Sequence, residues 1–170
     1  MRRRLLIVSL VAVVIILDQW TKAWARVHLE TPREWLGGLV SLFVTENSGA
    51  FLSLGANLPP IARTILFGVF VGITLAFAAY ALVTGRVRAS EAYAVSMVVG
   101  GGIGNLIDRV ARGGRVTDFI YMEAGPLHTG VFNVADVAIT AGVLWLFLAS
   151  LTARPRTPAH PADSPSPPSR

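Results

Sequence analysis

The sequence predicts an integral membrane protein built mainly from α-helices, with four membrane spans and one small β segment. Hydrophobic residues make up 53% of the 170 residues and charged residues only 15%, whereas soluble domains carry about 25% charged residues. The mean hydropathy is +0.58. Four apolar stretches are suited in length to crossing the hydrocarbon core of a bilayer.

The first predicted span covers residues 5–25 and follows the basic run Arg2–Arg4. This order is also typical of a cleaved signal peptide, and the small residues at 23–25 imitate a cleavage site. Asp18 and Lys22 are unusual in such a processing region, and further spans follow. We therefore expect a retained span whose N-terminus lies in the cytoplasm, as the positive-inside rule requires.

A β segment is expected at residues 37–57, between the first two spans. It opens at a glycine pair and contains short runs of β-branched and aromatic residues. Turn-forming residues at 46–49 predict a small pair of strands that reverses there, and Pro59-Pro60 end the segment. Because the first span leads out of the cytoplasm, this segment should lie at the extracytoplasmic membrane surface.

Three further spans are predicted at residues 61–83, 91–108 and 131–152. The short loop that carries Arg86 and Arg88 should be cytoplasmic. The third span contains a run of glycines with no Gly-Lys-Ser/Thr after it, so it indicates close helix packing rather than a phosphate loop.

Residues 1–153 are expected to form one membrane domain, with both termini in the cytoplasm. The tail at residues 154–170 is rich in proline and serine and has no apolar periodicity, so we expect it to be disordered and cytoplasmic.

Composition also excludes several classes of function. The chain has no cysteine, which excludes disulfides, thiol catalysis and cysteine-bound metal. Its three histidines are scattered, so we expect no metal site and no cofactor. The net charge of +5 could suggest nucleic acid, but the arginines lie at span ends, where topology and anionic lipid explain them.

Four of the five aspartates fall in one layer, at the extracytoplasmic ends of the predicted spans. Asp18 lies toward the far end of the first span, Asp108 ends the third, and Asp136 begins the fourth. Asp118 lies in the hairpin between the last two spans, and only Asp163 belongs to the tail. An ionised carboxylate in hydrocarbon costs about 3 kcal/mol even on lenient scales, so we expect these acids to have a use.

Two chemistries would use such a layer. Two carboxyl groups that share a proton can activate water and polarise a carbonyl. Alternatively, acids relay protons or cations through a transporter, which predicts acids at several membrane depths. Glu91 is the only acid expected in a cytoplasmic half of a span, so hydrolysis is favoured. A noncatalytic lipid-binding module stays open, as do an ion pair between Asp108 and Arg109 and a surface helix capped by Asp18.

Five motifs, in order along the chain, resemble signal peptidase II, the lipoprotein signal peptidase family of bacterial membranes. They are Asp18–Lys22, Asn47–Phe51, Gly101–Arg109, Val116–Phe119 and Phe132–Asp136. The match covers essentially the whole chain except the tail. Each motif is weak alone, but five in this order, in a chain of this size, are specific. One departure is the single Ala50, where the family commonly has two alanines.

The resemblance implies a four-transmembrane-helix bundle with a small extracytoplasmic β-cradle, in the bacterial cytoplasmic (inner) membrane. It implies an aspartic endopeptidase that cuts prolipoproteins before a diacylglyceryl-modified cysteine, with the site at the extracytoplasmic face. Asp118 and Asp136 would be the catalytic pair. The residues that line or support the site would be Asp18, Asn47, Asn105, Arg109 and Asn133. The expected partners are the lipid-modified prolipoprotein and membrane lipids but no nucleic acid, and the chain is expected to be a monomer.

Overall fold

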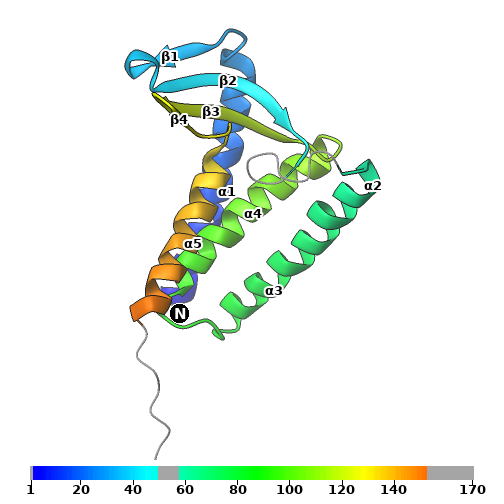
Figure 1. Cartoon of the computed structure of the whole chain (residues 1–170). Helices are drawn as coiled ribbons and strands as arrows, with labels where there is room; N and C mark the ends of the chain where they lie inside the picture. The colour runs from blue at the N-terminus through cyan, green and yellow to red at the C-terminus, as the bar shows by residue number, and fades with distance from the viewer. Residues whose placement is uncertain (1, 50–57, 153–170) are drawn as a thin grey trace, which may run out of the picture.

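The computed structural model describes residues 2–49 and 58–152, which form long helices with one sheet at their end (Figure 1). The helices are α1 (Arg2–His28), α2 (Pro60–Arg63), a π-helical stretch η3 (Thr64–Phe70), α3 (Val71–Val83), α4 (Ala92–Ala111) and α5 (Val134–Thr152). Helical structure is expected for these apolar stretches, because a helix satisfies its own backbone groups where no water is available. The N-terminus and the end of α5 lie opposite the sheet.

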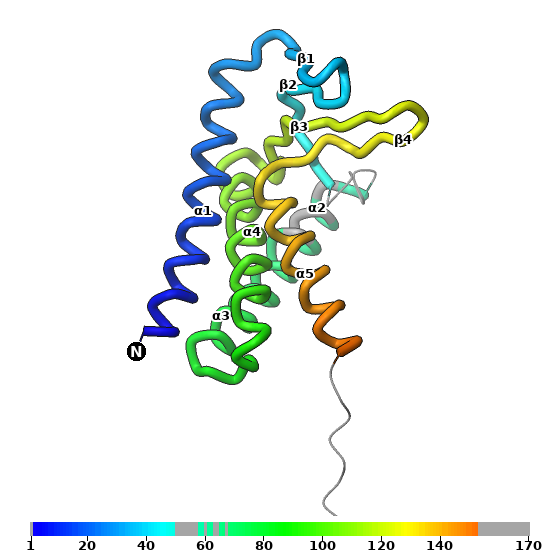
Figure 2. Tube along the Cα trace, turned by 90° about the vertical axis from the view of Figure 1, so that its left-hand side faces the viewer, coloured from blue at the N-terminus to red at the C-terminus, as the bar shows by residue number. Residues whose placement is uncertain are grey.

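Helix α4 is the centre of the bundle. It packs against α1, α3 and α5, and Figure 2 shows it between α1 and α5. Glycine permits this close approach: a Cβ atom at Gly101 would lie 2.5 Å from the carbonyl oxygen of Ala135, and one at Gly100 would lie 2.9 Å from Cβ of Val14. The packing role predicted for the glycine run is therefore confirmed.

Helices occupy all four regions predicted to be spans. In the described part of the chain, two of them are long and apolar enough to cross a membrane, Arg2–His28 and Val134–Thr152. The apolar helix Gly68–Val83 is shorter. Helix α4 has sufficient length, but polar residues at its end reduce its hydropathy. The crossing of all four helices therefore stays a prediction.

One antiparallel sheet contains all the strands of the described residues, in the order β1-β2-β3-β4. The strands are β1 (Arg33–Trp35), β2 (Val40–Asn47), β3 (Val116–Ala124) and β4 (Leu127–His128).

The strand pair of the described residues does not reverse at residues 46–49 as predicted. The chain reverses earlier, at Leu36–Gly38, where three successive residues have positive φ values of 53°, 69° and 90°. Strand β2 then runs without reversal to Asn47, and its second partner is β3, from the region predicted as a plain hairpin. The part of the prediction that covers residues 50–57 lies outside the described residues.

Strand β2 contains a bulge at the point where the sheet meets the helices. Leu42 pairs with Ile120, but the next pair along the ladder is Thr45 with Asp118, so β2 has one residue more than β3 between the two pairs. Because side chains alternate between faces, the extra residue reverses the alternation of β2. Thr45 and Asn47 therefore share a face with Asp118.

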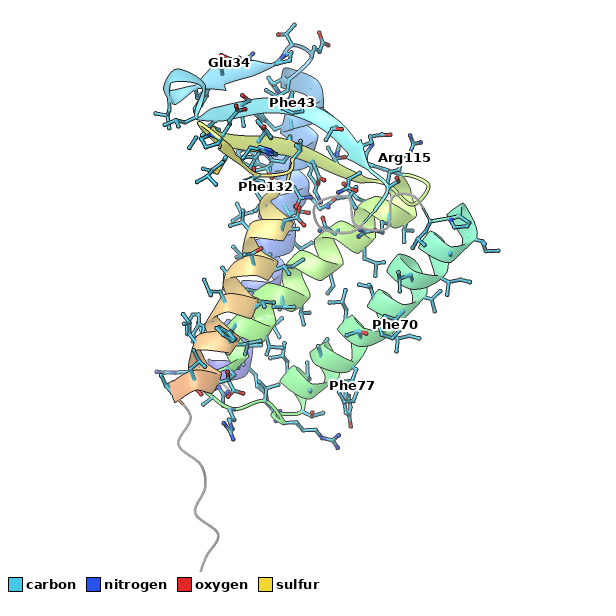
Figure 3. All side chains as sticks on the ribbon, in the orientation of Figure 1. Glu34, Phe43, Phe70, Phe77, Arg115 and Phe132 are labelled. Carbon is cyan, nitrogen blue, oxygen red and sulfur yellow. The ribbon has the colours of Figure 1, made fainter. Side chains whose placement is uncertain are left out.

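Phe132 connects the sheet to the start of α5 (Figure 3). Its backbone N–H donates to the carbonyl oxygen of Ile120 at 2.9 Å, and its carbonyl oxygen accepts from the N–H groups of Ile120 at 2.9 Å and Phe119 at 3.1 Å. A small apolar cluster of Ala25, Leu29 and Phe119 fills the junction with α1. These contacts hold the first turn of α5 directly beside β3.

Candidate active site

The seven predicted site residues are joined by hydrogen bonds where the sheet meets the helices. Asp18 lies on α1, Asn47 at the end of β2, Asn105 and Arg109 on α4, Asp118 on β3, Asn133 just before α5 and Asp136 in its first turn. Their burial is unusual for such polar side chains: Asp18 and Asn133 are 0% exposed, Asp118 is 1% and Asp136 is 7%.

Asn133 binds both members of the proposed carboxylate pair. Its Nδ2 donates to Oδ1 of Asp118 at 2.6 Å, and its backbone N–H donates to Oδ2 of Asp136 at 3.2 Å. The backbone N–H of Asp136 donates in return to Oδ1 of Asn133 at 3.0 Å. This reciprocal pair is a capping box at the start of α5. The spacing of three residues between Asn133 and Asp136 thus lets the same two side chains cap α5 and form part of the candidate site.

Asn105, on α4, joins Asp136 to Asn133 and Lys22. Its Nδ2 donates to Oδ1 of Asp136 at 2.9 Å. Its Oδ1 accepts from Nδ2 of Asn133 at 3.2 Å and from Nζ of Lys22 at 2.9 Å. Both carboxylates are therefore bound by neutral amides, and Asn105 links Asp136 to the ammonium group of Lys22.

Asp118 has a strongly altered acidity. Its pKa is raised to about 6, mainly by burial, and the negative charge of Asp136 acts in the same direction. The side-chain donors of Asn47 and Asn133 act in the opposite direction, because they bind the ionised form. Asn47 reaches Oδ2 of Asp118 at 2.9 Å from the end of β2. A carboxyl group of this kind can hold a proton near neutral pH.

Other residues of this network were not predicted as site residues, among them Gln19, Lys22, Asp108 and Thr117. Lys22 is 0% exposed and lies 2.8 Å from Oδ2 of Asp18 and 3.6 Å from Oδ2 of Asp108. Gln19 Nε2 donates to the same Asp18 oxygen and to the carbonyl oxygen of Gly104. The sequence does contain a signal for Lys22: an acid, Asp18, and a lysine stand four residues apart within an apolar helix.

Asp18 and Asp108 support the junction. Oδ1 of Asp18 accepts the backbone N–H of Ala135 at 2.9 Å, so α1 helps to cap α5. The alternative in which Asp18 caps a surface helix is wrong, because it lies inside α1. Oδ2 of Asp108 accepts the backbone N–H of Thr117 at 2.9 Å, and its ion pairs lie with Lys22 and with Arg112.

Arg109 reaches from α4 across to the end of β2. One guanidinium nitrogen donates to the carbonyl oxygen of Gly49 at 2.8 Å and the other to that of Asn105 at 3.3 Å. The side chain therefore holds the chain after Asn47 against the helices.

A groove of about 370 Å³ runs along α5 from Asp136. It is lined by Phe132, Asp136, Val137, Thr140, Ala141 and Leu144. One carboxylate of the pair thus lies at the head of a mostly apolar groove. Within residues 2–49 and 58–152, no three histidine or acidic side chains are grouped to hold a metal ion.

Comparison with known proteins gives a consistent result. A family model described as signal peptidase (SPase) II matches residues 10–152. The chain is 36% identical to a lipoprotein signal peptidase of Methylorubrum extorquens over 146 residues, which is 84% of each chain. It is 36% identical to one from Xanthomonas campestris over 142 residues, covering 82% of this chain and 84% of the relative.

Two solved structures of bacterial membrane enzymes, determined by the in meso method at 2.3 and 1.9 Å resolution, have the same fold. The first has a TM-score of 0.73 and 26% sequence identity and covers 85% of this chain and 87% of its own. The second has a TM-score of 0.72 and 25% identity and covers 87% and 94%. This chain therefore belongs to the signal peptidase II family of bacterial membrane hydrolases.

Proposed function

We propose that the protein is an aspartic endopeptidase that removes the signal peptide from prolipoproteins, before the diacylglyceryl-modified cysteine, with Asp118 and Asp136 as the catalytic pair. Membership of the family supports removal of the signal peptide from such substrates. The observation that carries the assignment of the pair is that the side chain and backbone of Asn133 bind both carboxylates.

The two carboxyl groups have different roles in this proposal. Asp136 accepts N–H donors at both oxygens, from Asn105 and from the backbone of Asn133, and it takes a proton from water. Asp118, with its pKa near 6, holds the shared proton and donates it toward the scissile carbonyl. The water oxygen attacks the carbonyl carbon, the C–N bond then breaks, and a proton passes to the leaving amine.

Asn105 and Asn133 are assigned here to orient the carboxylates, because their amide groups already bind them. Asn47 orients Asp118 in the same way. Arg109 positions the segment after β2, beside which a substrate peptide would enter.

We further propose a monomer with four spans, both ends of residues 1–153 in the cytoplasm, and the site at the extracytoplasmic face. The two clear apolar spans and the position of the sheet at one end of the bundle support this topology (Figure 1). The groove along α5 would accept an apolar part of the lipid-modified substrate. The predictions for residues 154–170 lie outside the described residues.

The transporter alternative receives less support. It requires acids at several membrane depths, whereas the buried acids of the described residues are Asp18, Asp108, Asp118 and Asp136, all within one network. A lipid-binding module without hydrolysis would not need one residue to bind two carboxylates.

The test is hydrolysis of a diacylglyceryl-modified precursor by purified protein, followed by release of the signal peptide. We expect Asp118→Asn and Asp136→Asn each to reduce kcat at least ~100-fold, the range of acid–base catalysis, while insertion and melting temperature in detergent are kept. Asp163→Asn is the matched control and should cleave normally. Near-normal turnover by either pair variant would show that the assignment is wrong.

A further inference from the structure

Lys22 is the only basic side chain among the described residues that is completely buried. It lies on α1 and faces α4, where it contacts Asn105 and Asp108, and it pairs with Asp18 on its own helix. A buried ammonium is costly unless its donors are used. All three partners accept hydrogen bonds or carry negative charge, so the site is built for a cation at this position.

The chemistry of lysine determines which way the Asn105 amide points. An ammonium group has three donors and no acceptor, so it binds only the oxygen of that amide, at 2.9 Å. Asn133 Nδ2 donates to the same oxygen at 3.2 Å. With Oδ1 held by two donors, Nδ2 of Asn105 must point to the other side, where it meets Oδ1 of Asp136 at 2.9 Å.

Without the ammonium, the Asn105 amide has a second arrangement. It could turn by half a rotation and present its oxygen to Asp136, and that contact is favourable only when Asp136 carries a proton. The shared proton would then lie on Asp136 instead of Asp118. Asn133 opposes this turn with one longer, neutral donor at 3.2 Å, whereas Lys22 opposes it with a charged donor at 2.9 Å and acts on Asp136 through Asn105.

We propose that Lys22 is a positioning residue for hydrolysis: through Asn105 it fixes which carboxyl group of the pair receives a donor and which holds the proton. This inference rests on the proposed function of Asp118 and Asp136. Lys22 also faces Asp18 and Asp108 directly, and Arg109 on α4 is a second cation whose charge acts on the pair. The Lys22 charge lowers the pKa of Asp118, opposing the larger effect of burial.

The first experiment compares Lys22→Met with the wild type in cleavage of the lipidated precursor across pH. We expect kcat to fall about 100-fold with little change in KM. The alkaline limb of kcat/KM should move to higher pH, because loss of the Lys22 charge raises the pKa of Asp118. Arg88→Met, which removes an exposed cation on the loop before α4, is the matched control. It should leave kcat and the alkaline limb of kcat/KM unchanged.

Lys22→Met removes the ammonium beside two buried acids, Asp18 and Asp108, and leaves Asp108 only its longer contact with Arg112, so it can unfold the protein. The double variant Asp18→Asn with Lys22→Met removes one charge of each sign and keeps an acceptor for the backbone N–H of Ala135. It should melt close to the wild type and still show the lower kcat and the shifted limb. A normal pH profile in a folded double variant would overturn the proposal, as would a low melting temperature with an unshifted limb.

A measurement on proteins that retain Lys22 is independent of these variants. Infrared spectra of protein labelled with ¹³C-aspartate should show a protonated carboxyl band that grows as the pH falls through about 6; this band should be absent in Asp118→Asn and present in Asp136→Asn. Loss of the band in Asp136→Asn alone would show that the proton lies on the other group and that the inference is wrong. If the wild type fails to cleave the precursor at all, the proposed function fails, whatever the position of the band.

Discussion

At the scale of single residues, amide side chains bind and orient the carboxylate pair. Asn47 and Asn133 bind Asp118, and Asn105 and Asn133 bind Asp136. A cation in direct contact would favour ionisation of both carboxyl groups, which would remove the proton that the proposed mechanism needs. A neutral amide also orients a carboxyl group, but it stabilises the ionised form less than a cation does. One carboxyl group of the pair can therefore stay protonated near pH 6.

Replacement of Asn47 tests this balance. Asn47 donates to the ionised form of Asp118 and so lowers its pKa; its loss in Asn47→Ala should raise that pKa above about 6. The proton is then kept to higher pH, so the alkaline limb of kcat/KM should move up by about one pH unit, the value of one charge-assisted hydrogen bond. Ser41→Ala on the same strand is the control. An unmoved limb would mean that Asp118 does not hold the shared proton.

The aspartates could be singled out from the sequence, because aspartate at the end of a membrane span is costly and therefore conspicuous. The amide side chains that bind them came from the family resemblance, and their role in the site stays a prediction. The sequence was not sufficient to predict Lys22. A lysine near a span end ordinarily extends its head to the membrane surface, and nothing local indicates that Asp108, on another helix, turns this one inward.

At the scale of elements, the network depends on how closely α1 and α4 approach. A Cβ atom at Gly104 would lie 2.5 Å from Oδ2 of Asp18, the oxygen that pairs with Lys22. Glycine at this position therefore makes room for a side chain of the neighbouring helix rather than for the helix backbone alone.

We accordingly expect Gly104→Ala to displace the Asp18 carboxylate. Overpacking of this kind costs about 1–3 kcal/mol, so the melting temperature in detergent should fall and cleavage with it. Gly72→Ala is the matched control, because a Cβ atom there meets only Leu106 at an ordinary 3.7 Å. Equal melting temperatures for the two variants would contradict this account of the packing.

The pairing of the strands could not be predicted from the sequence. The sequence indicated β structure around residues 40–47, but it did not indicate β1 and β3 as the partners of this strand. Strand β2 pairs with β3, which is far along the chain, and no local pattern specifies such a pairing. Strand β1 has only three residues, too few for a recognisable alternation.

At the scale of the whole molecule, the site forms where three helices and the sheet meet. Helices α1, α4 and α5 each contribute buried polar groups, and β2 and β3 cover them from one end (Figures 1 and 2). Helix α3 contributes packing: a Cβ atom at Gly102 of α4 would lie 2.5 Å from Leu75. No single helix or strand supplies all the residues of the site, so the site forms only when these helices and the sheet pack together.

The absence of cysteine from the sequence makes the topology directly testable. We expect Glu34→Cys on β1 to react with a membrane-impermeant maleimide in intact cells. Ser90→Cys, in the exposed loop before α4, should react only after permeabilisation. Both variants should retain cleavage of the lipidated precursor, which controls for misfolding. The opposite labelling pattern would invert the proposed orientation.

The bulge in β2 decides where the strand can lose a residue without disturbing the site. Deleting Val44 would remove the extra residue and leave Thr45 opposite Asp118 in a regular ladder, so Asn47 would stay on the face of Asp118. Deleting Glu46, beyond the bulge, would move Asn47 by one place along the ladder and turn it to the opposite face. We expect both variants to keep their helical circular dichroism and only the second to lose cleavage, so two deletions of equal length in one strand should have opposite outcomes.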